Sequence, residues 1–168
     1  MAKHLDLEEQ EQLAELKHFW KRYGNVISWV LIAVLGAVAA WNGYQYWQRN
    51  QSSQAAVMYD EVERAAVAGD VPKLERVMTD MKDRYAGTAY AEQAALLAAR
   101  IYQDKGNLDA AKGALAWVAG KGKDAGYQSV ARLRLSGMLL ESRAYEEALQ
   151  QLAAPMPKDF APLAADRS

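Results

Sequence analysis

Acidic side chains at helical spacing are the first residues in this sequence that could do chemistry. Two pairs of carboxylates are separated by three residues: Asp60 with Glu63, and Asp80 with Asp83. Such a pair can act as general acid and general base when burial separates the two pKa values. Nothing in the surrounding sequence marks either pair as buried, and both are typical of a solvated helix face.

The residue types used most for nucleophilic and metal chemistry are scarce. The chain of 168 residues has no Cys, and its only two histidines are His4 and His18. It also lacks a Gly-rich phosphate loop and a nucleophile elbow. With 20 basic and 21 acidic residues, the net charge is −1, which gives no electrostatic attraction to nucleic acid. We predict a protein that is not an enzyme, with no metal and no cofactor.

The elements that position the remaining residues begin with an apolar stretch near the N-terminus. Residues 23–48 contain no charged residue, and residues 26–41 contain none more polar than Ser28. A bilayer core about 30 Å thick needs roughly 20 helical residues, so this stretch is long enough to span it. Aromatic residues favour the headgroup level and flank the stretch on both sides. The flanking aromatics are Phe19, Trp20, Tyr23, Trp41, Tyr44, Tyr46 and Trp47.

A cleaved signal peptide is the alternative interpretation, because residues 37–39 match the small-x-small cleavage pattern. The preceding 22 residues are acidic rather than short and basic, which favours a retained single span. Lys17, Lys21 and Arg22 on its N-terminal side outnumber Arg49 on the other, which favours a cytoplasmic N-terminus. Residues 1–22 then form a cytoplasmic amphipathic arm, either touching a partner or serving only as a lead-in helix.

Residues 49–168 are rich in strong helix formers and repeat with a period of 37 residues. Gly69, Gly106 and Arg143 mark three turns at this spacing, each between two apolar-patterned helices. Because one hairpin cannot bury its apolar face alone, a repeated hairpin predicts a stacked solenoid. The predicted fold is all-α: one transmembrane helix followed by a helical-hairpin solenoid of about three repeats. Residues 160–168 look like the start of a fourth repeat, so we expect a C-terminal truncation.

The hairpins resemble the tetratricopeptide repeat. The middle repeat has its small residue, aromatic, turn glycine and second-helix alanine at Ala99, Tyr102, Gly106 and Ala111. The first repeat departs from this pattern at Leu74 and the third at Arg143. The period of 37 is also longer than the usual 34, so the links between hairpins are expected to be longer.

The whole chain resembles the YfgM-like family of ancillary subunits of the bacterial Sec translocon. The resemblance is carried by an acidic arm ending in FWKRYG at Phe19–Gly24, the span, WNGYQYW at Trp41–Trp47, and the degenerate repeats. It implies a single-pass inner-membrane protein with residues 49–168 in the periplasm. It also implies association with the SecYEG translocon and with a membrane-anchored periplasmic chaperone of the PpiD type. Unfolded secreted chains are a further expected partner.

Tetratricopeptide arrays bind partners on the concave face formed by the first helix of each hairpin. The repeat register assigns eight candidate residues to this face: Tyr59, Glu63, Gln93, Leu96, Arg100, Gln103, Leu133 and Leu140. Leu96 and Leu133 could instead belong to the core.

The leading functional hypothesis is therefore a non-enzymatic interaction protein that links the translocon to periplasmic chaperones and assists folding or trafficking of secreted proteins. The alternative is a membrane-anchored adaptor that regulates envelope-stress signalling through its cytoplasmic arm.

Overall fold

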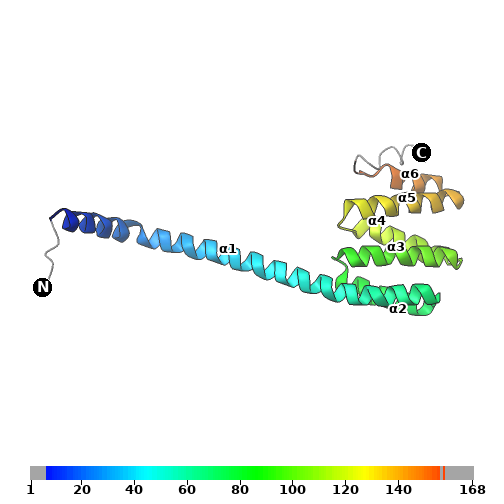
Figure 1. Ribbon diagram of the computed structural model, residues 1–168. Coiled ribbons are helices and arrows are strands. Elements are labelled where there is room, and N and C mark those ends of the chain that lie inside the picture. The colour runs from blue at the N-terminus through cyan, green and yellow to red at the C-terminus, as the bar shows by residue number, and fades with distance from the viewer. Residues whose placement is uncertain (1–6, 156, 158–168) are drawn as a thin grey trace. The chain divides into compact units, whose positions relative to one another are not determined.

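The computed structural model describes residues 7–155 and 157, and for residues 7–16, 18 and 19 it describes the backbone alone. Six helices account for these residues, without a strand among them, so the predicted all-α class is confirmed. The chain divides into two units, residues 1–48 and 49–168. Residues 160–168, where a fourth repeat was expected, lie outside the described residues (Figure 1).

The first unit contains most of helix α1, which runs without a break from Leu7 to Ala68. Only 6% of its most apolar 18-residue segment is buried, and large side chains such as Trp29 and Leu35 are about two-thirds exposed. An apolar helix of this length that protein does not cover is suited to lipid, where all its backbone groups are satisfied within the helix. Among the described residues, this is the one helix that is both long enough and apolar enough to cross a membrane.

The predicted interface aromatics lie on this helix. Trp20, Tyr23, Trp41, Tyr44, Tyr46 and Trp47 are all exposed. Tyr44 and Trp47 are in ring contact, with centroids 6.2 Å apart, as expected one turn apart on a helix. The side chain of Phe19 lies outside the described residues.

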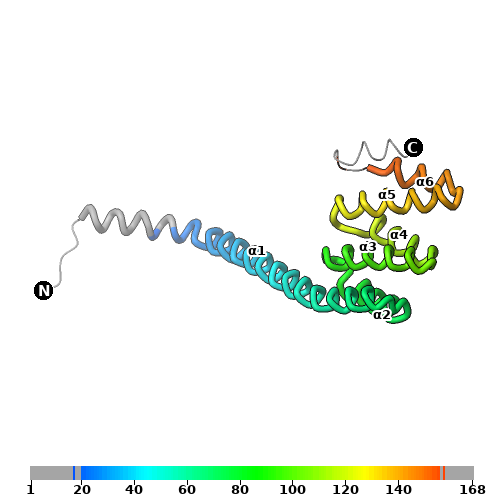
Figure 2. Tube along the Cα trace, turned by 45° about the vertical axis from the view of Figure 1, so that its right-hand side comes forward, coloured from blue at the N-terminus to red at the C-terminus, as the bar shows by residue number. Residues whose placement is uncertain are grey.

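The second unit is built from three hairpins, and Figure 2 shows them stacked on one another. The last turns of α1 pair with α2 (Val71–Tyr85), α3 (Ala89–Asp104) pairs with α4 (Leu108–Lys121), and α5 (Ala125–Glu141) pairs with α6 (Tyr145–Leu152). The bounds reproduce the 37-residue period, since α2, α4 and α6 begin at residues 71, 108 and 145.

The three hairpin turns have the same backbone geometry. Gly69, Gly106 and Arg143 have positive φ angles of 64°, 77° and 61°. The next residue in each turn donates its N–H back to a carbonyl five residues earlier: Asp70 to Ala65, Asn107 to Tyr102, and Ala144 to Leu139, at 2.8–3.1 Å. This is the Schellman arrangement, in which the left-handed residue lets the last carbonyls of a helix find donors.

The second helix of each hairpin starts at an N-cap. Asp70 and Asn107 accept hydrogen bonds from Lys73 and Ala110 N–H groups, at 3.0 and 3.3 Å. The third hairpin has Ala144 at the equivalent position, and this residue offers no side-chain cap. The third turn therefore has the less favourable residue both at the left-handed position and at the N-cap.

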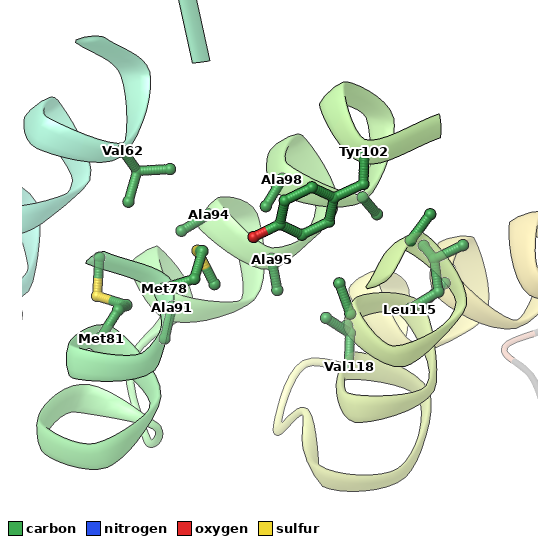
Figure 3. Packing of buried hydrophobic residues seen from close by; sticks show 14 of the residues in the cluster. Val62, Met78, Met81, Ala91, Ala94, Ala95, Ala98, Tyr102, Leu115 and Val118 are labelled. Atoms are coloured by element: carbon green, nitrogen blue, oxygen red, sulfur yellow. The ribbon is translucent and has the colours of Figure 1, made fainter. Parts of the chain in front are cut away.

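Small residues on α3 form the centre of the core. Ala91, Ala94, Ala95 and Ala98 are fully buried. Figure 3 shows Val62 and Met81 on one side of these alanines and Leu115 and Val118 on the other. Because alanine methyls occupy little space, neighbouring helices can pack closely on several sides of α3.

We predict that Arg143→Gly stabilises the protein. A non-glycine residue at positive φ costs about 1–2 kcal/mol, part of which is offset by the larger chain entropy of glycine when unfolded. The net gain should be about 0.5–1 kcal/mol. It can be measured as a shift in the denaturant midpoint of the full chain in detergent micelles, followed by circular dichroism.

Gly106→Ala is the matched control, because it introduces the same strain at an equivalent turn and should shift the midpoint the other way. If Arg143→Gly leaves the midpoint unchanged while Gly106→Ala lowers it, contacts of the arginine side chain must compensate for the strain.

Candidate partner-binding face

The first helices of the three hairpins form one surface, which we call the first-helix face: residues 49–68 of α1, with α3 and α5. Tyr59 of α1 and Tyr90 of α3 are in ring contact at 6.0 Å. Gln93 of α3 donates a hydrogen bond from its side-chain amide to the hydroxyl of Tyr127 on α5, at 2.5 Å. Helix α3 therefore lies between the other two first helices.

Tyrosines from all three first helices gather on this face. Tyr59, Tyr90 and Tyr127 are each at least partly exposed. The pKa of Tyr59 is raised, first by burial, then by the charge of Glu63 and a hydrogen bond to its carboxylate, and finally by Tyr127. The Glu63 carboxylate therefore lies beside the Tyr59 hydroxyl, one helical turn further along α1. We call Tyr59, Glu63, Tyr90, Gln93 and Tyr127 the tyrosine cluster.

An open groove of about 320 Å³ lies next to this cluster, between α1 and α3. Its lining residues are Glu63, Ala66, Val67, Leu97 and Ile101. Four of the five are apolar, and Glu63 belongs to both the groove and the cluster. Val67 is 91% exposed, the highest value among the large hydrophobic residues in the described part of the chain. Because Val67 lines the groove, its exposed side chain adds to the apolar surface that a partner can bury there.

The eight residues predicted for this face have different environments. Tyr59, Glu63 and Gln93 come together in the cluster. Arg100 and Gln103 are exposed on α3, and Arg100 forms a weak ion pair with Asp104 at 3.9 Å. Leu96 and Leu140 are half-buried against the core. Leu133 is only 8% exposed, so we leave it out of the candidate site.

Sequence reasoning missed Tyr90, Tyr127, Val67, Leu97 and Ile101. A usable signal was present for two of them, since Tyr127 follows Tyr90 by 37 residues, the repeat period. The two tyrosines therefore occupy equivalent positions at the starts of α3 and α5. The aliphatic residues carry no comparable signal, because a helix-face Leu or Ile looks the same whether it enters a core or borders a groove.

A buried carboxylate links α3 to the start of α5. Glu92 is 1% exposed, and its two oxygens accept backbone N–H groups from Lys123 and Asp124, at 2.6 and 3.4 Å. Asp124 in turn caps α5 by accepting the N–H of Tyr127 at 3.0 Å. This chain of hydrogen bonds runs from the core of α3 to a residue of the tyrosine cluster. Glu92 therefore anchors the backbone at the start of α5, where Tyr127 lies.

Acidic residues do not gather elsewhere in a way that suggests metal chemistry. In the described parts of the chain, no three His, Asp or Glu residues are placed to hold a metal ion. The contacts on the first-helix face are aromatic, aliphatic and hydrogen-bonding, which suits recognition of another polypeptide.

The sequence matches the pattern of a family described as tetratricopeptide repeat-like domain over residues 17–168. A protein of Neisseria gonorrhoeae named ancillary SecYEG translocon subunit is 35% identical over 97% of this chain and 78% of its own length. Proteins with the same name from Haemophilus influenzae and Escherichia coli are 27% and 23% identical, over 87% and 94% of this chain and 71% and 76% of their own lengths. No solved structure shows significant similarity.

The chain belongs to the YfgM-like family. The family resemblance inferred from the aromatic-flanked span and the degenerate repeats is therefore confirmed. In this YfgM-like chain, the tyrosine cluster and the α1–α3 groove are the candidate binding surface.

We predict that Glu92→Ala destabilises this YfgM-like chain. The substitution leaves two backbone N–H groups without their acceptor, and hydrogen bonds to a charged group contribute about 1.5–3 kcal/mol. The free energy of unfolding should fall by about 2–3 kcal/mol. Denaturant unfolding of the full chain in micelles, followed by circular dichroism, measures the change.

Glu61→Ala is the control for this loss, because Glu61 is an exposed acid on α1. Its effect should stay within about 0.5 kcal/mol. If Glu92→Ala lowers the free energy of unfolding no more than Glu61→Ala does, water replaces the buried carboxylate at no cost.

Proposed function

We propose that this protein is a non-enzymatic ancillary subunit of the Sec translocon. The observation that carries the proposal is the 35% identity, over nearly the whole chain, to a protein named for that role. The exposed apolar part of α1 supports it, because a membrane-spanning helix can pack against the transmembrane helices of a channel. The repeat domain adds a surface for a second partner.

Three consecutive segments of the sequence have different roles in this proposal. Residues 1–22 form a cytoplasmic arm, residues 23–48 form the span, and residues 49–168 form a periplasmic repeat domain at the inner membrane. This orientation rests on the basic residues Lys17, Lys21 and Arg22 before the span.

In this proposal the span contacts the SecYEG channel, and the repeat domain binds a membrane-anchored periplasmic chaperone of the PpiD type or an emerging secreted chain. The protein thereby links translocation to folding or trafficking of secreted proteins. The first-helix face supports this role, since tyrosines and exposed aliphatic residues are typical of interface anchors.

The proposed orientation predicts where a cysteine can be labelled. The natural chain has no Cys, so a single Ser53→Cys or Ala2→Cys variant carries the only thiol. In cells with a permeabilised outer membrane, an impermeant maleimide should label Ser53→Cys and should label Ala2→Cys only after lysis. Labelling with the opposite pattern would place the repeat domain in the cytoplasm and rule out the chaperone partnership.

The division of labour predicts which partners depend on the span. Tagged full chain, purified from mildly solubilised membranes, should bring down SecY-type subunits and a periplasmic chaperone, identified by mass spectrometry. Replacing residues 26–41 with an unrelated apolar span of equal length should remove the channel subunits and keep the chaperone.

Glu61→Gln serves as the control variant and should retain both partners. If the natural chain brings down neither partner, the proposal fails. A signalling adaptor acting through residues 1–22 would then be the better hypothesis.

A further inference from the structure

We infer that the tyrosine cluster and the α1–α3 groove together bind a helical segment that carries a basic side chain and an aliphatic side chain one helical turn apart. This inference rests on the proposed function as an interaction protein and adds the chemistry of the segment that it binds. Two adjacent features on the first-helix face support it, and they share Glu63.

The tyrosine cluster is suited to a cation. Rings of Tyr59, Tyr90 and Tyr127 come from three different helices, and aromatic faces attract Lys and Arg through their quadrupoles. The Glu63 carboxylate beside them has two oxygens, each able to accept more than one hydrogen bond. A hydroxyl donor such as that of Tyr59 can occupy only one of these acceptor positions, which leaves others for a donor from outside.

Two arginines are near Glu63 in sequence or in repeat register, namely Arg64 beside it and Arg100 one period later on α3, and both have other partners. Arg64 donates its side-chain Nε–H to the backbone carbonyl of Asp60 at 3.2 Å, and Arg100 is paired with Asp104. Among the described residues, no Lys or Arg lies within 4.0 Å of the Glu63 carboxylate. Glu63 is exposed, so its charge faces the groove and the solvent above it. A partner with a basic side chain would supply the missing counter-charge.

The groove is suited to an aliphatic side chain. Ala66, Leu97 and Ile101 form apolar walls, and the side chain of Val67 stands in solvent at its mouth. Burying these surfaces against a partner is favourable at about 25 cal/mol per Å². A volume of about 320 Å³ accommodates side chains rather than a folded surface, so the occupant should be a single segment of chain.

The spacing of the two features sets the spacing in the partner. Glu63 and Val67 are four residues apart on α1, and four residues of helix span about 6 Å. A partner helix lying along the groove presents side chains at the same interval when they are three or four residues apart. The expected motif is therefore a Lys or Arg with a Leu, Ile or Met three or four positions away.

Synthetic helical peptides binding to the full chain in lipid nanodiscs test this inference, with fluorescence anisotropy as the readout. One peptide carries Lys and Leu four residues apart, a second replaces Lys with Glu, and a third replaces Leu with Ser. The Lys–Leu peptide should bind at least about tenfold more tightly than either of the others.

Two matched pairs of variants assign the binding to the site. Val67→Asp should weaken the Lys–Leu peptide on the order of tenfold, whereas Val57→Asp, at another exposed valine of the same helix, should not. Glu63→Lys should reverse the preference so that the Glu–Leu peptide binds better, whereas Glu61→Lys should keep the natural preference. All four side chains are exposed, so none of these substitutions disturbs the core.

Several results would overturn the inference. These are equal binding of all three peptides, no binding of the Lys–Leu peptide, equal loss in Val57→Asp and Val67→Asp, or a preference unchanged in Glu63→Lys. Self-association that Val67→Asp abolishes would identify a second copy of the chain as the occupant instead.

The co-purification of channel subunits is measured separately. If it persists while the peptides fail to bind, the inference fails and the proposed function stands. If it is absent while the Lys–Leu peptide binds, the proposed function fails on its own.

Discussion

Close packing around α3 is the constraint on which the rest of the repeat domain depends. Five of the seven buried positions of this helix are alanine, among them Ala91, Ala94 and Ala98. A larger side chain at these positions would push neighbouring helices apart, at a cost of about 1–3 kcal/mol. Because α1 and α5 pack on either side of α3, their tyrosines reach the same part of the first-helix face. The small side chains in the core thus determine how close the first helices lie and where their tyrosines meet.

The fold could be predicted from local signals. Each hairpin turn needs a left-handed residue followed by a helix start, and Gly69–Asp70 and Gly106–Asn107 carry both features in the sequence. The third turn was found through its spacing, although Arg143 and Ala144 have neither preferred residue type. Its geometry is the same because the helices on both sides are held by the core through Leu139 and Ala148. Tertiary packing there overrides a poor local sequence.

The candidate site was only partly predictable, and the reason lies in how repeats differ from one another. Tyr59, Leu96 and Leu133 are equivalent by the 37-residue period, yet Leu133 is buried whereas Tyr59 and Leu96 are only partly buried. Equivalent positions in a degenerate solenoid have different neighbours, so a register alone does not fix exposure. The hydrogen bond between Gln93 and Tyr127 depends on two helices meeting, and the spacing within either helix gives no sign of it.

The two units of this chain suit different surroundings, lipid for the first and water for the second. This difference bears on the affinity that the candidate site needs. The first unit exposes apolar side chains all around α1, which suits lipid, whereas the second buries its apolar residues around α3. A binding domain tethered to a membrane meets tethered partners at a high effective concentration. A groove that accepts only side chains, assisted by one carboxylate and three tyrosines, would be weak for partners diffusing freely in solution. If the partner is held at the same membrane, as the proposed function has it, such a site can remain reversible and still be occupied.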